Sequence, residues 1–249
     1  MLLTVATNSA DILGNPETPS TISNNDSQLL YGEQFQVEKE HGAYVHGHSV
    51  LDGYKGYVER DQLIKNAPEA NAIIIVRASH IYLKPSFKSR PITKISFLSR
   101  LTTTNEQENG FTKLNDGTWV FSSHISPLAG FKMSCDLAQI AEIFIGTPYL
   151  YAGRSSFGID CSGLIQQVLI AGGYPCPPRD SKYQQNHIGK PASEDDLQRN
   201  DIVFFDGHVG IMMDNKYILN ATARHMSTVI EDITDLESAY GEIKHITRL

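Results

Sequence analysis

The feature that most restricts the fold of this chain is a change of sequence pattern at residues 126–134, SPLAGFKMS. Before it, short stretches of alternating β-branched and aromatic residues are broken by Gly, Asp, Asn and Pro, which is typical of small all-β modules. After it, apolar residues recur at helical spacing. Because proline and glycine in this segment indicate a boundary, we expect all-β structure up to residue 130 and a different domain at residues 131–249.

The first part of the chain repeats itself. ADILGNP, an acidic strand pattern ending near Gly42, and DGYKGYVERDQL are followed in the same order by HIYLKP, a pattern ending near Gly110, and DGTWVFSSHI. This repeat predicts two tandem β-barrel modules, at residues 1–66 and 67–130. On pattern alone, one irregular β domain is the alternative.

The second part begins with helices. An amphipathic helix is predicted between Asp136 and Gly146 by apolar residues at helical spacing, namely Leu137, Ile140, Ala141, Phe144 and Ile145. A second helix is expected over residues 161–171, before two glycines, and four extended runs follow: DIVFFD, HVGIMM, YILNAT and STVIEDI. Helices followed by an antiparallel sheet predict an α+β domain.

Cys161 lies at the predicted start of the second helix. Asp160 is a good N-cap, so the thiol occupies the first turn, where unpaired N–H groups and the helix dipole favour the thiolate and lower a cysteine pKa. A lone cysteine is more often a small buried apolar residue. The polar neighbours Asp160 and Ser162 favour a nucleophile instead.

His208 and Asn220 are candidates for the base and for the residue that orients it. His208 opens HVGIMM, and Asn220 lies in the next run, YILNAT. If a three-residue turn pairs Met213 with Tyr217, His208 and Asn220 are diagonal neighbours on one face of the hairpin, with backbones about 7–8 Å apart and side chains within reach of each other. A two-residue turn would instead place His208 and Asn220 on opposite faces of the hairpin. His225 is the alternative third member of a Cys-His arrangement.

Composition restricts the class of protein. The net charge is -7 and no cluster of lysine and arginine stands out, so we expect no nucleic acid partner. No apolar run approaches the ~18 residues that span a bilayer, and the first residues lack a basic start, so we expect a cytoplasmic chain, with secreted or periplasmic export by another route left open. The three cysteines lack zinc-site spacing and no nucleotide motif occurs, so we expect no metal and no organic cofactor.

Three segments in order, GTPYLYAGRSSFGIDCSGLIQQVLIAGG, PRDSKYQQ and DLQRNDIVFFDGHVGIMMDNKYILNAT, resemble the NlpC/P60 cysteine peptidases, which hydrolyse bacterial cell-wall peptides. The resemblance covers about residues 134–234. It implies a papain-like α+β catalytic domain with helices packed on an antiparallel sheet at residues 131–249. The β repeats look like the two SH3-type barrels that precede such domains in γ-D-glutamyl-L-diamino acid endopeptidases.

The resemblance also implies roles for individual residues. Cys161 corresponds to the nucleophile, His208 to the base and Asn220 to the residue that orients His208, at a position where many members carry a second histidine. Asp160 and Ser162 would help to hold the free N-terminal amine of the substrate.

Further positions would line the site. Tyr149 corresponds to a tyrosine that lines it, and Arg179 and Asp180 would border it, or else form a solvated loop pair. In the first β module, Glu59 and Tyr54 are candidates for contacts with the substrate amine.

The function implied by the resemblance is hydrolysis of the γ-D-glutamyl-L-diamino acid bond, with diaminopimelate or lysine, in peptidoglycan stem peptides during muropeptide recycling. Two alternatives stay open: a catalytically silent protein that binds cell-wall peptides, and an acyltransferase that uses the same thiol. Oligomeric state has no signal in the sequence.

Overall fold

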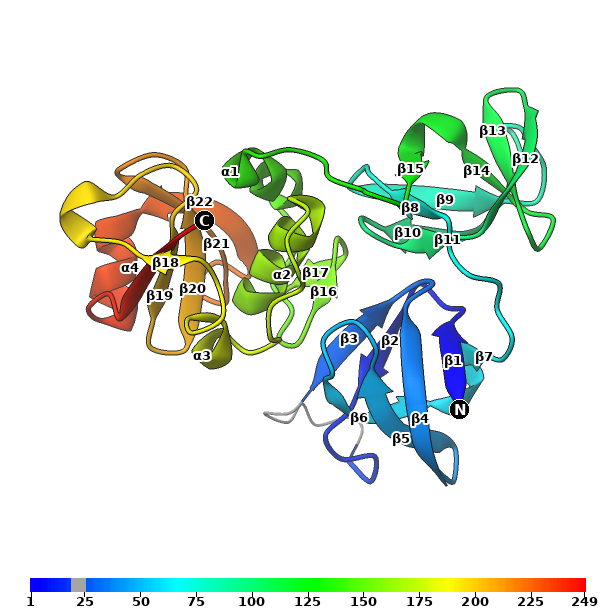
Figure 1. Cartoon of the computed structure of the whole chain (residues 1–249), viewed down its shortest axis with the longest axis horizontal. Helices are drawn as coiled ribbons and strands as arrows, with labels where there is room; N and C mark the ends of the chain where they lie inside the picture. Colours follow the sequence, from blue (N-terminus) through cyan, green and yellow to red (C-terminus); the bar gives the residue numbers. More distant parts are fainter. Residues whose placement is uncertain (19–25) are drawn as a thin grey trace. The chain divides into compact units, whose positions relative to one another are not determined.

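The computed structural model describes residues 1–18 and 26–249. The chain folds into two compact units, Met1–Phe131 and Lys132–Leu249. Figure 1 shows the first unit in blue to green and the second in green to red. Within the described residues, no helix has the length and apolar character needed to cross a membrane.

The first part of unit 1 is a small barrel of two antiparallel sheets, with strand orders β6-β5-β4-β1-β7 and β2-β3. Apolar side chains alternate along its strands and fill one core that includes Leu3, Phe35 and Val58. Its elements are β1 (Leu2–Val5), β2 (Ser9–Ile12), β3 (Ser27–Leu30), β4 (Gln34–His41), β5 (Tyr44–Ser49), β6 (Lys55–Glu59), the 3-10 helix η1 (Arg60–Gln62) and β7 (Leu63–Ile64).

The second part of unit 1 forms another barrel, with strand orders β10-β9-β14-β13-β12 and β11-β8-β15. It has its own core, which includes Ile74, Ile95 and Val120. Its elements are β8 (Ala72–Ile74), β9 (Ala78–Tyr82), β10 (Pro91–Ser96), β11 (Arg100–Leu101), β12 (Thr103–Glu108), β13 (Phe111–Leu114), β14 (Trp119–Phe121), η2 (Ser122–His124) and β15 (Ile125–Pro127).

The two barrels share one connectivity. In the first, β1 pairs with β4 and β7; in the second, β8 pairs with β11 and β15. The tight turns that end β4 and β12 both use a glycine with positive φ, 60° at Gly42 and 81° at Gly110, a conformation that only glycine adopts readily. The sequence repeat therefore coincides with two sets of sheets that share one connectivity, each with its own core, within unit 1.

Unit 2 contains a six-stranded antiparallel sheet of order β18-β23-β19-β20-β21-β22. Its strands are β18 (Lys190–Pro191), β19 (Ile202–Phe205), β20 (His208–Met212), β21 (Tyr217–Thr222), β22 (Ser227–Asp232) and β23 (His245–Arg248), and β16 (Arg154–Ser155) pairs with β17 (Gly158–Ile159) beside it. The helices are α1 (Leu137–Ala141), η3 (Glu142–Phe144), α2 (Cys161–Ala171), α3 (Ser181–Gln184), η4 (Glu194–Asp196) and α4 (Ile233–Tyr240).

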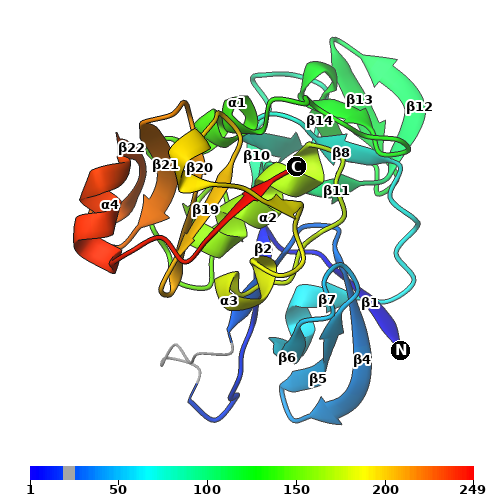
Figure 2. The same ribbon diagram turned by 60° about the vertical axis from the view of Figure 1, so that its left-hand side comes forward.

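Helices α2 and α4 cover opposite faces of this sheet, as both ribbon views show (Figure 2). α2 packs on β20 and β21. On the other face, Ile233 and Leu236 of α4 join a core with Met212, Ile218 and their neighbours. The unit is thus an α+β domain with helices packed on an antiparallel sheet, as the sequence predicts.

The structure corrects the length of the first predicted helix. Asp136 caps it, accepting a hydrogen bond from the Gln139 N–H at 3.3 Å, but the α-helix ends at Ala141 and tightens into η3. Ile145, expected on the apolar face, is 42% exposed. α4 and β23 were not predicted, and α4 proves important for the site.

Candidate active site

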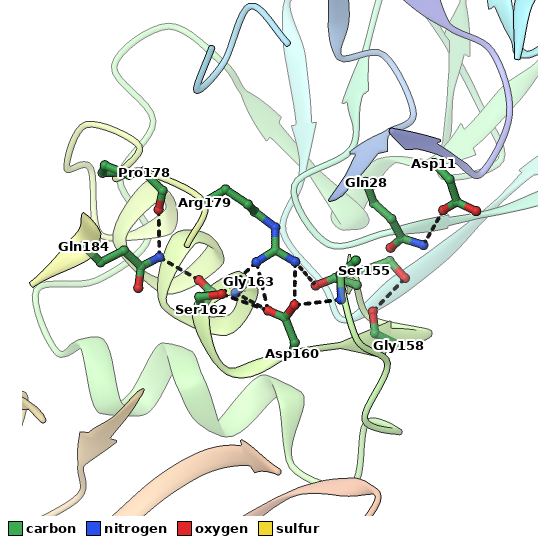
Figure 3. A network of polar contacts seen from close by, with 12 residues as sticks. Asp11, Gln28, Ser155, Gly158, Asp160, Ser162, Gly163, Pro178, Arg179 and Gln184 are labelled. Atoms are coloured by element: carbon green, nitrogen blue, oxygen red, sulfur yellow. Dashed lines mark hydrogen bonds and ion pairs between the residues drawn. The ribbon is translucent and has the colours of Figure 1, made fainter. Parts of the chain in front are cut away.

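The start of α2 is fixed by the carboxylate of Asp160. Its Oδ1 accepts from the Gly163 N–H at 2.7 Å, which is the predicted N-cap bond, and its Oδ2 accepts from the Ala152 N–H at 2.8 Å. The Ser162 hydroxyl also donates to Oδ1, at 3.2 Å. Figure 3 shows the bonds among Asp160, Ser162 and Gly163. They fix the first turn of α2, in which Cys161 lies.

Arg179 lies against the same carboxylate. Its guanidinium donates to Oδ1 and Oδ2 of Asp160 at 3.0 and 2.6 Å, and to the Ser162 hydroxyl at 2.7 Å, as Figure 3 shows. Arg179 is buried, so the sequence alternative of a solvated loop residue is wrong for it. Such a bidentate pair, enclosed by protein, holds the first turn of α2, which carries Cys161, in a fixed orientation.

The ionisation expected for Cys161 is not found. The residue is 7% exposed, and burial, together with the negative charge of Asp160, raises the pKa of its thiol to about 12. The N–H groups of Val209 and Ser162 donate toward Sγ and the Arg179 charge favours the thiolate, but these effects are smaller. Burial and the Asp160 charge therefore oppose the thiolate that the helix N-terminus was predicted to favour.

The predicted hairpin register is confirmed. Met212 pairs with Ile218, and the Met213 N–H donates to the Tyr217 carbonyl at 2.8 Å. His208 and Asn220 consequently share a face, and His208 Nε2 lies 3.0 Å from Asn220 Oδ1. The imidazole and the amide thus stand in the arrangement expected of a base and its orienting residue.

The imidazole of His208 is enclosed. The ring of Tyr240, from α4, stacks on it with centroids 4.1 Å apart and planes 7° from parallel. Burial lowers the pKa of His208 to about 4, although the bond to Asn220 and the charge of Glu231 act in the opposite direction. At neutral pH the imidazole is therefore neutral and able to accept a proton.

Cys161 lies beside the start of β20, the strand that carries His208. Val209, whose N–H points at Sγ of Cys161, directly follows His208. Burial is the main cause that raises the pKa of the Tyr149 phenol, followed by the charges of Cys161, Asp160 and Tyr240. Tyr149 therefore lies near both Cys161 and Tyr240, whose ring stacks on His208.

The remaining predicted residues are placed as follows. Asp180 is half-buried at the start of α3, next to Arg179. His225 bonds Glu231 at 2.9 Å, so Asn220 and not His225 is the partner of His208. In unit 1, Glu59 accepts from Gln62 at 3.0 Å, and Tyr54 packs against the core of the first barrel.

Sequence reasoning missed Glu231 and Tyr240. Glu231 pairs with Ile218 and so shares a face of the sheet with Asn220, a diagonal relation that the next hairpin register would have indicated. Tyr240 had no signal because no element was expected after residue 233. Across residues 1–18 and 26–249, no group of three or more His, Cys, Asp or Glu side chains could hold a metal ion.

Comparison with known proteins gives the family. The model described as NlpC/P60 family matches residues 146–243, and the model described as bacterial dipeptidyl-peptidase Sh3 domain matches residues 17–63. A protein named gamma-D-glutamyl-L-lysine dipeptidyl-peptidase from Bacillus subtilis is 30% identical in an alignment of 239 residues that covers 86% of this chain and 77% of that protein. The chain belongs to the NlpC/P60 family. It is a hydrolase of the cysteine peptidase type, with a bacterial SH3 domain before the catalytic domain.

A second relative and a solved structure are also similar to this chain. A Bacillus cereus protein with the same name as the Bacillus subtilis relative is 28% identical over 72% of this chain, which spans 60% of that protein's length. The crystal structure of an NlpC/P60 family protein from Bacillus cereus has a TM-score of 0.84 at 20% identity, covering 100% of this chain and 99% of the other. At that identity the structural likeness shows the fold.

Proposed function

We propose that this NlpC/P60 peptidase hydrolyses the bond between γ-D-glutamate and an L-diamino acid, lysine or diaminopimelate, in peptidoglycan stem peptides. The names of the Bacillus relatives support this substrate class. The observation that carries the chemistry is the place of Cys161 at the start of β20: its Sγ lies beside the N–H of Val209, the residue after His208, and His208 Nε2 is held 3.0 Å from Asn220 Oδ1.

The reaction begins with a neutral pair. Because the pKa of Cys161 is raised to about 12 and that of His208 is lowered to about 4, a thiolate-imidazolium pair is not the resting state. His208 Nδ1 accepts the thiol proton as Sγ attacks the γ-carbonyl carbon of the glutamyl residue. N–H groups at the start of α2 stabilise the oxyanion that forms.

Collapse of the tetrahedral intermediate breaks the amide bond. His208 returns its proton to the departing amine of the diamino acid, and the γ-D-glutamyl group stays on Sγ of Cys161 as a thioester. Water, deprotonated by His208, then attacks the thioester carbonyl and releases the glutamyl product and the free thiol. The proton balance closes with one water consumed.

Polar groups around the nucleophile would hold the other end of the substrate. Asp160 and Ser162 are the proposed contacts for a free N-terminal amine, with Tyr149, Arg179 and Asp180 lining the site. The Asp160 carboxylate and the Ser162 hydroxyl both already accept hydrogen bonds from Arg179, so in this proposal the substrate amine shares these two acceptors with the guanidinium.

A direct assay tests the reaction. The wild type, Cys161→Ala and Cys135→Ala are incubated with L-Ala-γ-D-Glu-L-Lys and with its diaminopimelate analogue, and products are identified by mass spectrometry. We expect free diamino acid from the wild type and from Cys135→Ala, whose thiol is exposed, and none from Cys161→Ala. Binding without product would indicate a silent peptide-binding protein, and a new amide formed with an added amine would indicate an acyltransferase.

Two further comparisons test the substrate and the role. N-acetylation of the alanine should abolish cleavage if a free amine is required. We also propose a role in recycling of muropeptides within the cytoplasm, for which sugar-free stem peptides should be cleaved faster than intact peptidoglycan. Equal rates on the two substrates would remove that proposal and leave the peptidase chemistry intact.

A further inference from the structure

Behind His208 lies a chain of hydrogen bonds that extends beyond Asn220. Asn220 Nδ2 donates to Glu231 Oε2 at 3.0 Å, while its Oδ1 faces His208 Nε2 at 3.0 Å. Glu231 lies on β22, one strand further from the base, on the same face of the sheet. Asn220 is fully buried, so both ends of its amide depend on these two partners.

Glu231 is held as an anion. Its other oxygen, Oε1, is 2.9 Å from His225 Nε2 and 3.2 Å from Arg224 Nη1. Its side chain is 9% exposed, whereas those of His225 and Arg224 are 47% and 36% exposed. Burial works against its ionisation, but the bonds from Asn220 and His225 and the charge of Arg224 lower its pKa overall.

This arrangement has one consistent set of protons. A carboxylate can only accept, so Asn220 must present its NH₂ group to Glu231 and its carbonyl to His208. A carbonyl can also only accept, so Nε2 of His208 must carry the hydrogen. Nδ1 is then left with its lone pair, which is the form that can take a proton from a thiol.

We propose that Glu231 is a positioning residue that selects the tautomer of His208 by fixing the orientation of the Asn220 amide. The inference rests on the proposed function of His208 as base. Without Glu231, the amide can rotate and offer its NH₂ group to Nε2, which favours the tautomer protonated at Nδ1. That tautomer cannot accept the thiol proton.

The first test is spectroscopic and needs no substrate. In ¹⁵N-labelled protein, the long-range couplings and shifts of the His208 ring show which nitrogen is protonated. We expect the Nε2-protonated form in the wild type and in Glu231→Gln, whose amide oxygen still accepts from Asn220. We expect a mixture of tautomers in Glu231→Ala. The Nε2-protonated form alone in Glu231→Ala would overturn the proposal.

The second test is kinetic. At metal-bound histidines, loss of the hydrogen-bond partner behind the imidazole lowers activity by about 10–100-fold. We expect Glu231→Ala to lower kcat by a factor of that order and to leave KM little changed. Glu231→Gln should recover most of kcat. Glu242→Gln, an exposed carboxylate beyond α4, is the matched control and should behave as wild type.

The two tests separate this inference from the proposed function. If the wild type shows no hydrolysis but the tautomer shifts in Glu231→Ala, the positioning role holds and the proposed reaction fails. If the wild type hydrolyses the peptide and Glu231→Ala retains both kcat and tautomer, the proposal for Glu231 fails alone. Circular dichroism of each folded variant checks that a lost activity is not a lost fold.

Discussion

At the scale of single residues, the neutral state of Cys161 distinguishes this site from one with a preformed thiolate. Because the pKa of the buried thiol is raised to about 12, we expect Cys161 to react slowly with iodoacetamide at pH 7 in the absence of substrate. Exposed Cys135 serves as the internal reference. Mass spectrometry of each cysteine peptide across a pH series gives both rates. Faster alkylation of Cys161 than of Cys135, with a plateau below pH 7, would contradict this prediction.

The sequence predicted the contact between His208 and Asn220 but not the state of the thiol. The contact follows from strand parity, which a three-residue turn determines locally. The ionisation of Cys161 depends on how much protein covers the sulfur and on the nearby charge of Asp160, and the covering groups come from segments distant in sequence. The sequence shows that Cys161 lies at a helix N-terminus. Only the structure shows that burial and Asp160 raise the thiol pKa more than the N–H groups and Arg179 lower it.

At the scale of elements, the glycine after Cys161-Ser162 has a physical reason. A Cβ on Gly163 would lie 2.4 Å from the backbone oxygen of Gly153, so α2 approaches the preceding loop too closely for any side chain. Ala in a helix is normally more stable than Gly by about 1 kcal/mol. Here a clash with backbone should cost more, since overpacking costs roughly 1–3 kcal/mol.

We therefore expect Gly163→Ala to lower the free energy of unfolding of unit 2 by about 1–2 kcal/mol. Urea denaturation followed by the helical circular dichroism signal measures it, because α1, α2, α3 and α4 all belong to unit 2. Ser238→Ala, on the exposed face of α4, is the control and should change stability by less than about 0.5 kcal/mol. If Gly163→Ala is as stable as the wild type, the loop at Gly153 can shift to accommodate the added Cβ without a loss of stability, which would contradict this prediction.

Elements that need distant partners escaped prediction. α4 is eight residues long and buries only Ile233 and Leu236, too short a pattern to separate from a loop. β23 enters the sheet between β18 and β19, a pairing that no local pattern encodes. α2 was predicted with its observed bounds because capping by Asp160, apolar spacing and two terminal glycines agree.

At the scale of the whole molecule, the boundary between the all-β part and the α+β part was predicted from the change of sequence pattern at residues 126–134. The repeat within the first part was predicted from three segments that recur in the same order. The cores of the two barrels and of unit 2 are separate clusters of buried apolar residues. Trp119, the single tryptophan, lies in unit 1, whereas the α-helices lie in unit 2. Fluorescence and helical circular dichroism therefore report on different units of the same chain.

This separation allows a test of how the buried base affects stability. His208 has a folded-state pKa of about 4 against an ordinary value of 6.5, so between these values the unfolded chain binds more protons than the folded one. The stability of unit 2 should accordingly be greatest above pH 6.5 and fall as the pH is lowered toward 4, by at most about 3 kcal/mol from this group. Urea denaturation at several pH values, followed by circular dichroism, measures the slope. His208→Gln removes the titrating group and keeps a side chain that can bond Asn220. In this variant the free energy of unfolding should change less steeply with pH. An unchanged slope would assign the acid sensitivity to other groups.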